Sequence, residues 1–328
     1  WNNLKLCAVY RYPVELLWRP LAIIGMVMFL LGVSSGITPS GETNITRGVF
    51  WSFSGLVFLL TVLALLSWES VRLGWVMVSL ACLAGYTLGR EKPIVAKALP
   101  WLWGASLPLG FVLLYGVPGD AGNILRVVET REWGGFMLTL IISVVGITVS
   151  FPLGIALALG RRSKLPAIKY FCIGFIEIIR GAPLISWLFI ASLLVPQLFN
   201  VSPDRIGPLL RALVAVTLFS SAYMAENVRG GLQAVPRGQR EAAQALGLSG
   251  WQTLKMIVLP QALKAVIPAI VGQSIGLFKD TSLVFIVGLF DFFNIANTVV
   301  ANQPESPLVT GGIRLELSLF VAVIYFFF

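Results

Sequence analysis

The chain has 328 residues and a formal net charge of +9, and 57% of its residues are apolar while 12% are charged. A soluble domain carries about a quarter charged residues, so this composition excludes one and predicts an all-α integral membrane protein. The positive charge does not indicate nucleic-acid binding, because Lys and Arg lie in short segments beside apolar runs. There is no histidine, and Cys7, Cys82 and Cys172 lack the spacing of a metal site, so neither a metal nor a His-based catalytic centre is expected.

Apolar runs that approach the roughly 20 residues needed to cross a bilayer follow one another along the chain. The conspicuous polar motifs lie later, so we expect additional N-terminal transmembrane helices in residues 1–130 and a membrane core in residues 131–328. The chain begins at Trp1 and ends at Phe328 inside an apolar run, and we expect both ends to be incomplete. The expected spans are Leu21–Ile37, Val49–Ser67, Leu73–Leu88, Ala98–Val117, Gly134–Gly160, Ile168–Pro196, Gly207–Ala225, Lys264–Phe278, Ser282–Ala301 and Ile313–Phe328.

The turn after the fifth expected span indicates the orientation in the membrane. It contains four cations and no acid, which is typical of a cytoplasmic turn; the cations are Arg161, Arg162, Lys164 and Lys169. Counting from this turn places the polar loop 229–263 in the cytoplasm and residues 118–133 outside. The first cations of the chain then fall outside, against the rule, so either an early span is miscounted or an upstream span sets the orientation; these cations are Lys5, Arg11 and Arg19.

The polar loop contains a short predicted helix that must serve something in the water, because membrane spans surround it. Pro236 suits the first turn of this helix, and Gly247 suits its end in a left-handed conformation. Arg237 and Glu241 share one face. A second face is small and suits insertion into a groove of another protein; it comprises Ala242, Ala245 and Leu246. The alternative is an amphipathic helix resting on the bilayer, which normally carries large apolar anchors and several Lys.

A second helix is predicted directly after the first. Ser249 and Gln252 have the spacing of a capping box, which starts a helix at Ser249. Its apolar face is predicted to run until Pro260 interrupts it; this face comprises Trp251, Leu254 and Val258. Two helices joined in this way form a rigid connection that can transmit a movement to the adjoining span.

Two charged pairs lie in or at the end of expected spans. Glu177 and Arg180 are three residues apart and can neutralise one another, before Gly181 and a nearby proline break the helix. Ionisable groups in a span usually face a pathway or a partner, so this pair belongs either to a pathway or to the structure of the cytoplasmic side. Glu226 and Arg229 repeat the spacing, and we interpret them as a clasp between the membrane helices and the polar loop.

A third polar group consists of Lys279, Asp280, Thr281 and Ser282. It follows Lys264 by only about 14 apolar residues, too few to cross the hydrocarbon core at 1.5 Å per residue. We therefore expect a broken helix at depth in the membrane, which is tolerated only where the backbone is buried in protein or lines a cavity. A cation, an anion and two hydroxyls suit the carboxylate and ammonium of a zwitterion, and an internal salt bridge that stabilises the break is the alternative.

Several sequence stretches stand out in a fixed order. They are Arg180-Gly-Ala-Pro-Leu184, Tyr223-x-Ala-Glu226, Arg229-Gly-Gly-Leu232, Val235-Pro-x-Gly-Gln239, Glu241-Ala-Ala-x3-Gly247 followed by Ile257-x-Leu-Pro260, and Phe278-Lys-Asp-Thr-Ser-Leu283. This series resembles the polar amino acid uptake branch of the ABC importers, the histidine/glutamine permease-like family, from about Gly134 to Ile313. The extra N-terminal spans and residues 159–166 are most similar to a membrane subunit of the general L-amino-acid permease.

The resemblance implies the type I transmembrane domain of an ABC importer, with a five-helix core, extra N-terminal spans and an ATPase-docking loop at 229–263. It implies a translocation subunit, multi-pass in the bacterial inner membrane, that moves polar or general L-amino acids inward by alternating access. The implied partners are a second homologous permease subunit, two ATP-binding subunits that hold ATP and Mg, a periplasmic amino-acid-binding protein, the amino acid and membrane lipid. The sequence lacks Gly-x-x-x-x-Gly-Lys-Ser/Thr, so the chain itself is not expected to be an enzyme or to hold a cofactor.

The same resemblance implies roles for individual residues. Those expected to dock the ATPase are Arg237, Glu241, Ala242, Ala243, Ala245, Leu246 and Gly247. Those expected to bind substrate are Lys279, Asp280, Thr281, Ser282, Arg180 and Gly181. Those expected in structural pairs are Glu177, Glu226 and Arg229. The alternative function is a secondary amino acid transporter driven by an ion gradient, which needs no ATPase partner and usually carries more acidic or His groups in its spans; a structural scaffold would leave the Lys279–Ser282 group unexplained.

Overall fold

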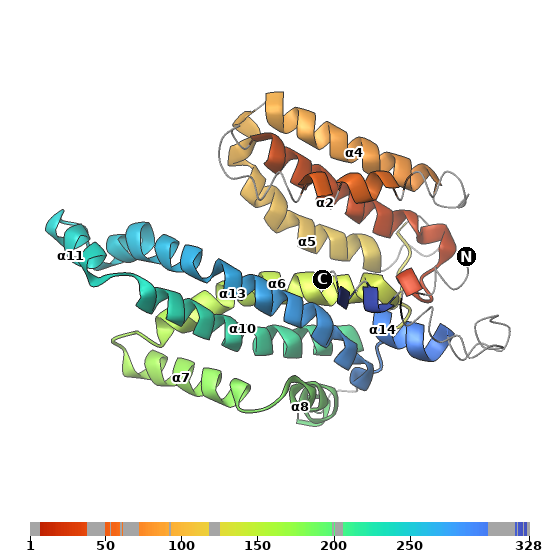
Figure 1. The fold of residues 1–328 in the computed structure, drawn as a ribbon. Helices are drawn as coiled ribbons and strands as arrows, with labels where there is room; N and C mark the ends of the chain where they lie inside the picture. The colour runs from red at the N-terminus through yellow and green to blue at the C-terminus, as the bar shows by residue number, and fades with distance from the viewer. Residues whose placement is uncertain are drawn as a thin grey trace. The chain divides into compact units, whose positions relative to one another are not determined.

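The computed structural model describes residues 7–37, 50–52, 54–59, 61, 72–91, 93–117, 125–198, 200, 206–300, 319, 321–323 and 325–326. These residues form helices and connecting turns, and they divide into two compact units (Figure 1). The C-terminal unit lies within Trp1–Arg11 and Trp133–Phe328, and the N-terminal unit within Tyr12–Glu132. Of the expected span Val49–Ser67 the structure describes 50–52, 54–59 and 61, and of Ile313–Phe328 it describes 319, 321–323 and 325–326.

Within that part of the chain, five helices are long and apolar enough to cross a membrane, which confirms the expected multi-span helical protein. Two shorter helices, Pro166–Arg180 and Leu184–Leu198, are bent by 103° where they meet, and they make a sixth crossing if they count as one broken span. The bend falls at Gly181 and Pro183, as the sequence predicts. The five long helices are Val14–Ile37, Arg72–Glu91, Gly135–Gly160, Pro208–Ala234 and Gly250–Val287.

The N-terminal unit is built on a close crossing of two helices. Its elements are η1 (Val14–Leu16), α2 (Trp18–Ile37), α4 (Arg72–Glu91), η3 (Pro93–Lys97) and α5 (Leu99–Tyr115). Gly32 and Gly36 of α2 face Gly85 and Gly89 of α4, each against the other helix's backbone. A Cβ atom on Gly32 would lie 2.7 Å from the carbonyl oxygen of Cys82. Glycines spaced four apart on both helices therefore let the two backbones touch.

A buried arginine joins the start of α2 to the end of α5. Arg19 is 0% exposed and donates to the carbonyl oxygens of Leu114 at 3.4 Å and Arg126 at 2.9 Å. Tyr12 donates to the same Leu114 oxygen at 3.0 Å. A cation is stabilised at a helix C-terminus, where carbonyl groups lack helical partners. Arg19 is therefore a structural group, and it should not be counted with the loop cations that the positive-inside rule describes.

The C-terminal unit contains the polar motifs. Figure 1 shows α6, α10 and α13 side by side, with α11 at one end and α14 at the other, and α10 contacts α6, α7, α8 and α13. The elements are α6 (Gly135–Gly160), α7 (Pro166–Arg180), α8 (Leu184–Phe189), the π-helix η4 (Ile190–Leu194), α9 (Val195–Leu198), α10 (Pro208–Ala234), α11 (Arg237–Ala245), α12 (Gly250–Gln252), the π-helix η5 (Thr253–Val258), α13 (Leu259–Asp280), the 3-10 helix η6 (Thr281–Val287), α14 (Phe292–Asn294) and the π-helix η7 (Ile295–Val300).

The long helix after α11 differs from the prediction in two ways. Pro260 does not interrupt it, because it lies in the first turn of α13, where a missing N–H is tolerated, and the π-helix η5 precedes it. Nor is the backbone broken at Lys279, since α13 continues to Asp280 and η6 follows at once. The span begins near residue 250 and not at Lys264, so the predicted short span and the predicted broken helix are both wrong. The turn instead comes at Gly288, with φ +81°, and Ser282–Ala301 is not a single helix.

Candidate functional site

The short helix α11 ends in a geometry that only a glycine accepts easily. Gly247 has φ +79°, in the left-handed region that the sequence predicts. The N–H of Leu248 donates to the Ala243 carbonyl at 3.1 Å, and the N–H of Gly247 donates to the Gln244 carbonyl at 2.9 Å. These are the two hydrogen bonds of a Schellman motif. The end of α11 is thus fixed in direction.

One face of α11 is open to a partner. Glu241, Ala242, Ala245 and Leu246 are all exposed, and the Leu246 side chain is 82% exposed. Ala243, in contrast, is 4% exposed, so it packs against the rest of this chain and is not on the exposed face. No described residue forms an ion pair with Glu241. The exposed face therefore presents one large apolar side chain, Leu246, between alanines and next to the carboxylate of Glu241. Such a face can fit into a groove on another protein.

The helix that follows α11 is capped and anchored. Ser249 and Gln252 form the predicted capping box, with the Gln252 N–H donating to Ser249 Oγ at 3.3 Å and the Ser249 N–H to Gln252 Oε1 at 2.9 Å. Val258 is 1% exposed, whereas Trp251 is 66% exposed, so the predicted common apolar face excludes Trp251. The π-helix η5 changes the rotation of successive side chains, which explains the difference. Residues 250–287 then continue as one span of 38 residues.

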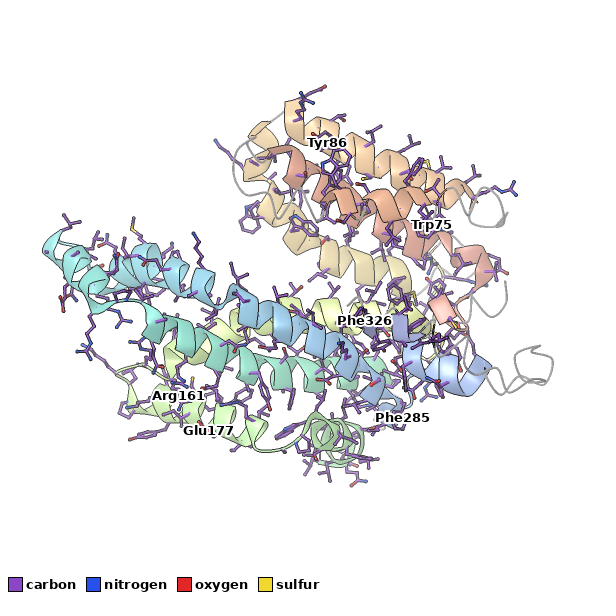
Figure 2. The ribbon with its side chains drawn as sticks, in the orientation of Figure 1. Trp75, Tyr86, Arg161, Glu177, Phe285 and Phe326 are labelled. Carbon is purple, nitrogen blue, oxygen red and sulfur yellow. The ribbon has the colours of Figure 1, made fainter. Side chains whose placement is uncertain are left out.

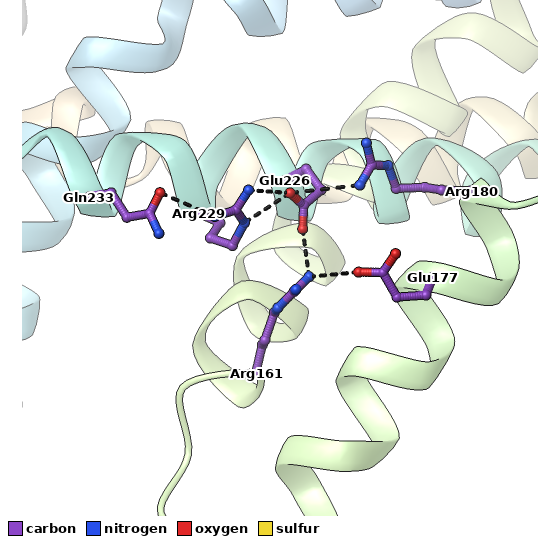
Figure 3. Close-up of polar contacts among 6 residues, drawn as sticks. All are labelled: Arg161, Glu177, Arg180, Glu226, Arg229 and Gln233. Atoms are coloured by element: carbon purple, nitrogen blue, oxygen red, sulfur yellow. Dashed lines mark hydrogen bonds and ion pairs between the residues drawn. The ribbon is translucent and has the colours of Figure 1, made fainter.

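Glu226 lies at the centre of an ion cluster near the end of α10 (Figure 3). Arg161, in the turn after α6, donates to Glu226 at 2.7 Å and to Glu177 of α7 at 3.2 Å. Arg229 donates from Nε at 2.8 Å to the other Glu226 oxygen and also lies 2.7 Å from it through Nη2. Arg180 of α7 lies 3.7 Å from that same oxygen. The cluster joins α6, α7 and α10, and Figure 2 shows Arg161 and Glu177 toward the α11 end of the unit, with Phe285 toward the other end.

The prediction that Glu177 and Arg180 neutralise one another is wrong, although both lie on α7 as expected. Glu177 pairs with Arg161, and Arg180 pairs with Glu226 and lies over the Tyr223 ring at 5.3 Å. Pairs three residues apart on a helix contribute only about 0.2–0.5 kcal/mol. Partners on neighbouring helices therefore compete with them easily.

The polar end of α13 is partly open. Lys279 and Asp280 are exposed, and no described residue forms an ion pair with either, so the alternative of an internal salt bridge is not observed. Thr281 is 1% exposed and donates to the Phe278 carbonyl at 2.7 Å, as a helical hydroxyl commonly does. Ser282 accepts from Asn294 through its carbonyl at 2.8 Å. Lys279 and Asp280 thus retain their hydrogen-bonding capacity for a ligand or another chain.

The six candidate substrate residues do not form one group. Arg180 and Gly181 belong to the Glu226 side of the unit, and Gly181 continues the helix end by donating to the Glu177 carbonyl at 2.9 Å. The other four lie at the end of α13 and in η6. No hydrogen bond or ion pair among the described residues joins the two groups directly, and α8, which follows Gly181, packs against η6.

A row of polar side chains crosses three helices and was not predicted from the sequence. Ser220 of α10 donates to Ser150 of α6 at 3.1 Å, and Gln273 of α13 donates to Ser220 Oγ at 3.0 Å. Asn227 of α10 donates to Gln273 Oε1 at 2.6 Å. Ser, Asn and Gln inside apolar runs are the signal that such interhelical hydrogen bonds leave in a sequence.

The comparisons with known proteins agree with this architecture. The family described as the binding-protein-dependent transport system inner membrane component matches residues 150–328, more than half of the chain. The glutamate/glutamine/aspartate/asparagine transport system permease protein BztC of Rhodobacter capsulatus is 41% identical over 328 residues, covering 97% of this chain and 71% of that protein. The inner membrane amino-acid ABC transporter permease protein YhdY of Escherichia coli K12 is 46% identical over 258 residues, covering 76% of this chain and 67% of that protein.

A solved structure has the same type of fold. The crystal structure of an amino acid ABC transporter with histidines matches with a TM-score of 0.50 and 29% identity, over 58% of this chain and 84% of the matched one. The match confirms the expected type I ABC-importer transmembrane fold. With its exposed helix between membrane spans and the family match over residues 150–328, the chain belongs to the family of binding-protein-dependent transport system inner membrane components.

Proposed function

We propose that this chain is the translocation subunit of an ATP-driven uptake system for polar amino acids, working by alternating access in a bacterial inner membrane. The observation that carries the proposal is the exposed face of α11, joined by a fixed turn to the helix of residues 250–287, which carries two charges, Lys279 and Asp280, with no ion-pair partner among the described residues. The names of the relatives support amino acids as the substrate class, because BztC and YhdY are both named as permeases for them.

The ATP-binding subunits dock on α11. Leu246 and the neighbouring alanines enter a groove of the ATPase, and Glu241 supplies a charge for a basic group at its rim. The ATP and Mg belong to those subunits, and this chain contributes the docking surface alone. Because the Schellman motif and the capping box fix both ends of the connection, a movement of α11 is transmitted to the helix of residues 250–287.

The substrate passes the end of α13. Lys279 and Asp280 are exposed within the span of residues 250–287, where ionisable groups normally face a pathway or a partner. Their charges complement the carboxylate and the ammonium of an amino acid. The Thr281 hydroxyl already donates to the Phe278 carbonyl of its own helix, so we assign Thr281 to the junction of α13 and η6 and not to the ligand.

A second, homologous permease subunit covers this face. A Cβ atom added to Gly272 or Gly276 of α13 would meet nothing within 4 Å, so the helix presents an open, low surface before Lys279. Small residues of this kind allow another helix to approach closely in a membrane. A periplasmic binding protein would deliver the amino acid from the other side.

The test is uptake by the complete complex in proteoliposomes, with ATP inside and the binding protein and a radiolabelled amino acid outside. ATP-dependent uptake is expected, and Glu241→Lys should reduce it to background while the chain still inserts and still binds its permease partner. Glu129→Lys reverses an exposed carboxylate outside the docking loop and should leave uptake unchanged. Uptake driven by an ion gradient without ATP would instead establish the secondary-transporter alternative.

A further inference from the structure

The C-terminal unit contains a cavity of about 330 Å³ next to the ion cluster. This volume lies within the range of about 300–1,000 Å³ that is usual for small-ligand pockets. Since α6 ends at Gly160 and α10 at Ala234, the cavity lies at the α11 end of the membrane helices. The residues that line it are Arg161, Arg162, Arg229 and Gln233.

The cavity carries more positive than negative charge. Arg161 and Arg229 are paired with the carboxylates of the ion cluster. Gln233 accepts from Arg229 at 3.1 Å through its amide oxygen, so its NH2 group is left to donate (Figure 3). Arg162 is exposed, and no carboxylate among the described residues pairs with it.

A further cation approaches from the docking helix. The pKa of the Arg162 guanidinium is lowered, first by partial loss of water and then by the charge of Arg240 in α11. Arg240 donates to the neutral Leu232 carbonyl at 3.2 Å, and no carboxylate among the described residues pairs with it. An anion near the two guanidinium groups would replace their repulsion by attraction.

We propose that this cavity binds a phosphate-bearing anion through Arg162, with Arg161, Arg229 and the Gln233 amide as further donors. The planar guanidinium matches two phosphate oxygens at once, which a lysine cannot do. The ion has two sources with the same chemistry: the headgroup of an anionic phospholipid in the cytoplasmic leaflet, or inorganic phosphate from the cytosol. Basic pockets at the cytoplasmic ends of membrane helices suit such headgroups.

Binding would tie the turn after α6 to α11 through Arg162 and Arg240. This consequence for coupling rests on the proposed function, whereas the binding itself does not. The experiment therefore measures anion binding, and a failure of uptake leaves its outcome unaffected.

The complete complex is placed in nanodiscs of phosphatidylglycerol mixed with phosphatidylcholine, and in pure phosphatidylcholine discs with inorganic phosphate. Native mass spectrometry counts the phosphatidylglycerol retained, and calorimetry measures the binding of phosphate. Arg162→Gln should weaken binding at least about tenfold, since it removes charge-assisted hydrogen bonds. Lys164→Gln removes the same charge from the same turn without altering the lining, and should bind as the wild type does.

Selective loss of retained phosphatidylglycerol in Arg162→Gln would support the site and identify a lipid headgroup. Selective loss of phosphate binding in phosphatidylcholine discs would support it and identify the soluble ion. Arg162→Lys keeps the charge and should bind more tightly than Arg162→Gln, which excludes misfolding as the cause. The proposal is overturned if the wild type binds neither anion, if Arg162→Gln and Lys164→Gln lose binding equally, or if the Lys and Gln variants at position 162 bind equally.

Discussion

The two units of the chain hold their helices together in different ways. In the N-terminal unit, α2 and α4 meet through glycines, backbone against backbone. In the C-terminal unit, Gly231 of α10 likewise meets the Ala262 backbone of α13. There, however, α6, α10 and α13 are also joined by hydrogen bonds among Ser, Asn and Gln, and α6, α7 and α10 by the ion cluster.

This difference bears on motion. A glycine contact has one register, because any shift along the helix brings a larger side chain against the facing backbone. Hydrogen bonds and ion pairs can exchange partners, and the ion cluster offers several arginines to one carboxylate. We therefore interpret the α2–α4 contact as fixed, and the ion cluster as the part of the C-terminal unit that can exchange partners during transport.

The largest effect on stability is expected for Glu226→Ala, which removes the carboxylate that three arginines share. Breaking a buried ion pair costs about 3–5 kcal/mol, and we expect about 2–3 kcal/mol because the arginine side chains are 26–35% exposed. The free energy of unfolding in mixed detergent measures it. Glu15→Gln, which disrupts an exposed pair with Arg126, should cost less than about 1 kcal/mol; equal costs would show that the cluster is only a surface feature.

A smaller loss is expected for Gly85→Ala in the N-terminal unit. The new methyl group would overlap the Phe29 carbonyl oxygen, and overpacking of this kind costs about 1–3 kcal/mol. Gly104→Ala is the matched control, because a Cβ atom there meets nothing within 4 Å, and it should be neutral or slightly stabilising. The thermal unfolding midpoint distinguishes the two variants. If both behave alike, the close backbone contact does not hold the unit together.

Gln273→Leu should cost about 0.6–1.7 kcal/mol, the scale of interhelical hydrogen bonds measured in a membrane protein. It removes the amide that bonds to both Ser220 and Asn227. We also expect the rate of ATP-driven uptake to change, since this row crosses the helices that are proposed to move. Ser274→Ala is the control, because among the described residues Ser274 bonds through its side chain only to Ile270 of its own helix. An altered stability with unchanged uptake would assign the row to structure alone.

Asp280→Asn should have the smallest effect on stability, below about 0.5 kcal/mol, because no described residue pairs with Asp280. Its effect should fall on transport, as a raised KM for the amino acid with ATPase docking unchanged. Uptake kinetics and co-purification of the ATPase measure the two separately. A destabilised chain with an unchanged KM would favour a structural role at the end of α13.

The parts that were predictable from the sequence depend on neighbours along the chain. The left-handed Gly247, the capping box of Ser249 and Gln252, and the bend at Gly181 each follow from local chemistry. The prediction for Pro260 was wrong because a proline that interrupts the interior of a helix is tolerated in its first turn. The sequence of η5 does not indicate that α13 begins at Leu259, directly before this proline. The predicted break at Lys279 was wrong because the helix was taken to start at Lys264 and not near residue 250.

Long-range pairing was the part that the sequence could not supply. Several cations lie at different distances from Glu177 along the sequence. Only the folded structure shows that Glu177 pairs with Arg161, 16 residues away, and not with Arg180. The glycines of α2 and α4 can be read as close-packing positions, but neither helix indicates its partner. The cavity beside Arg162 likewise depends on α6 and α10 ending side by side.

The buried Arg19 has a consequence for the order of events during synthesis. Its two carbonyl partners follow it by 95 and 107 residues. At about 5–20 residues per second, they leave the ribosome roughly 5–20 s after Arg19 does. During that interval the side chain cannot yet bond to either of these two carbonyl groups. The insertion machinery therefore acts on a charge whose final environment has not yet been made.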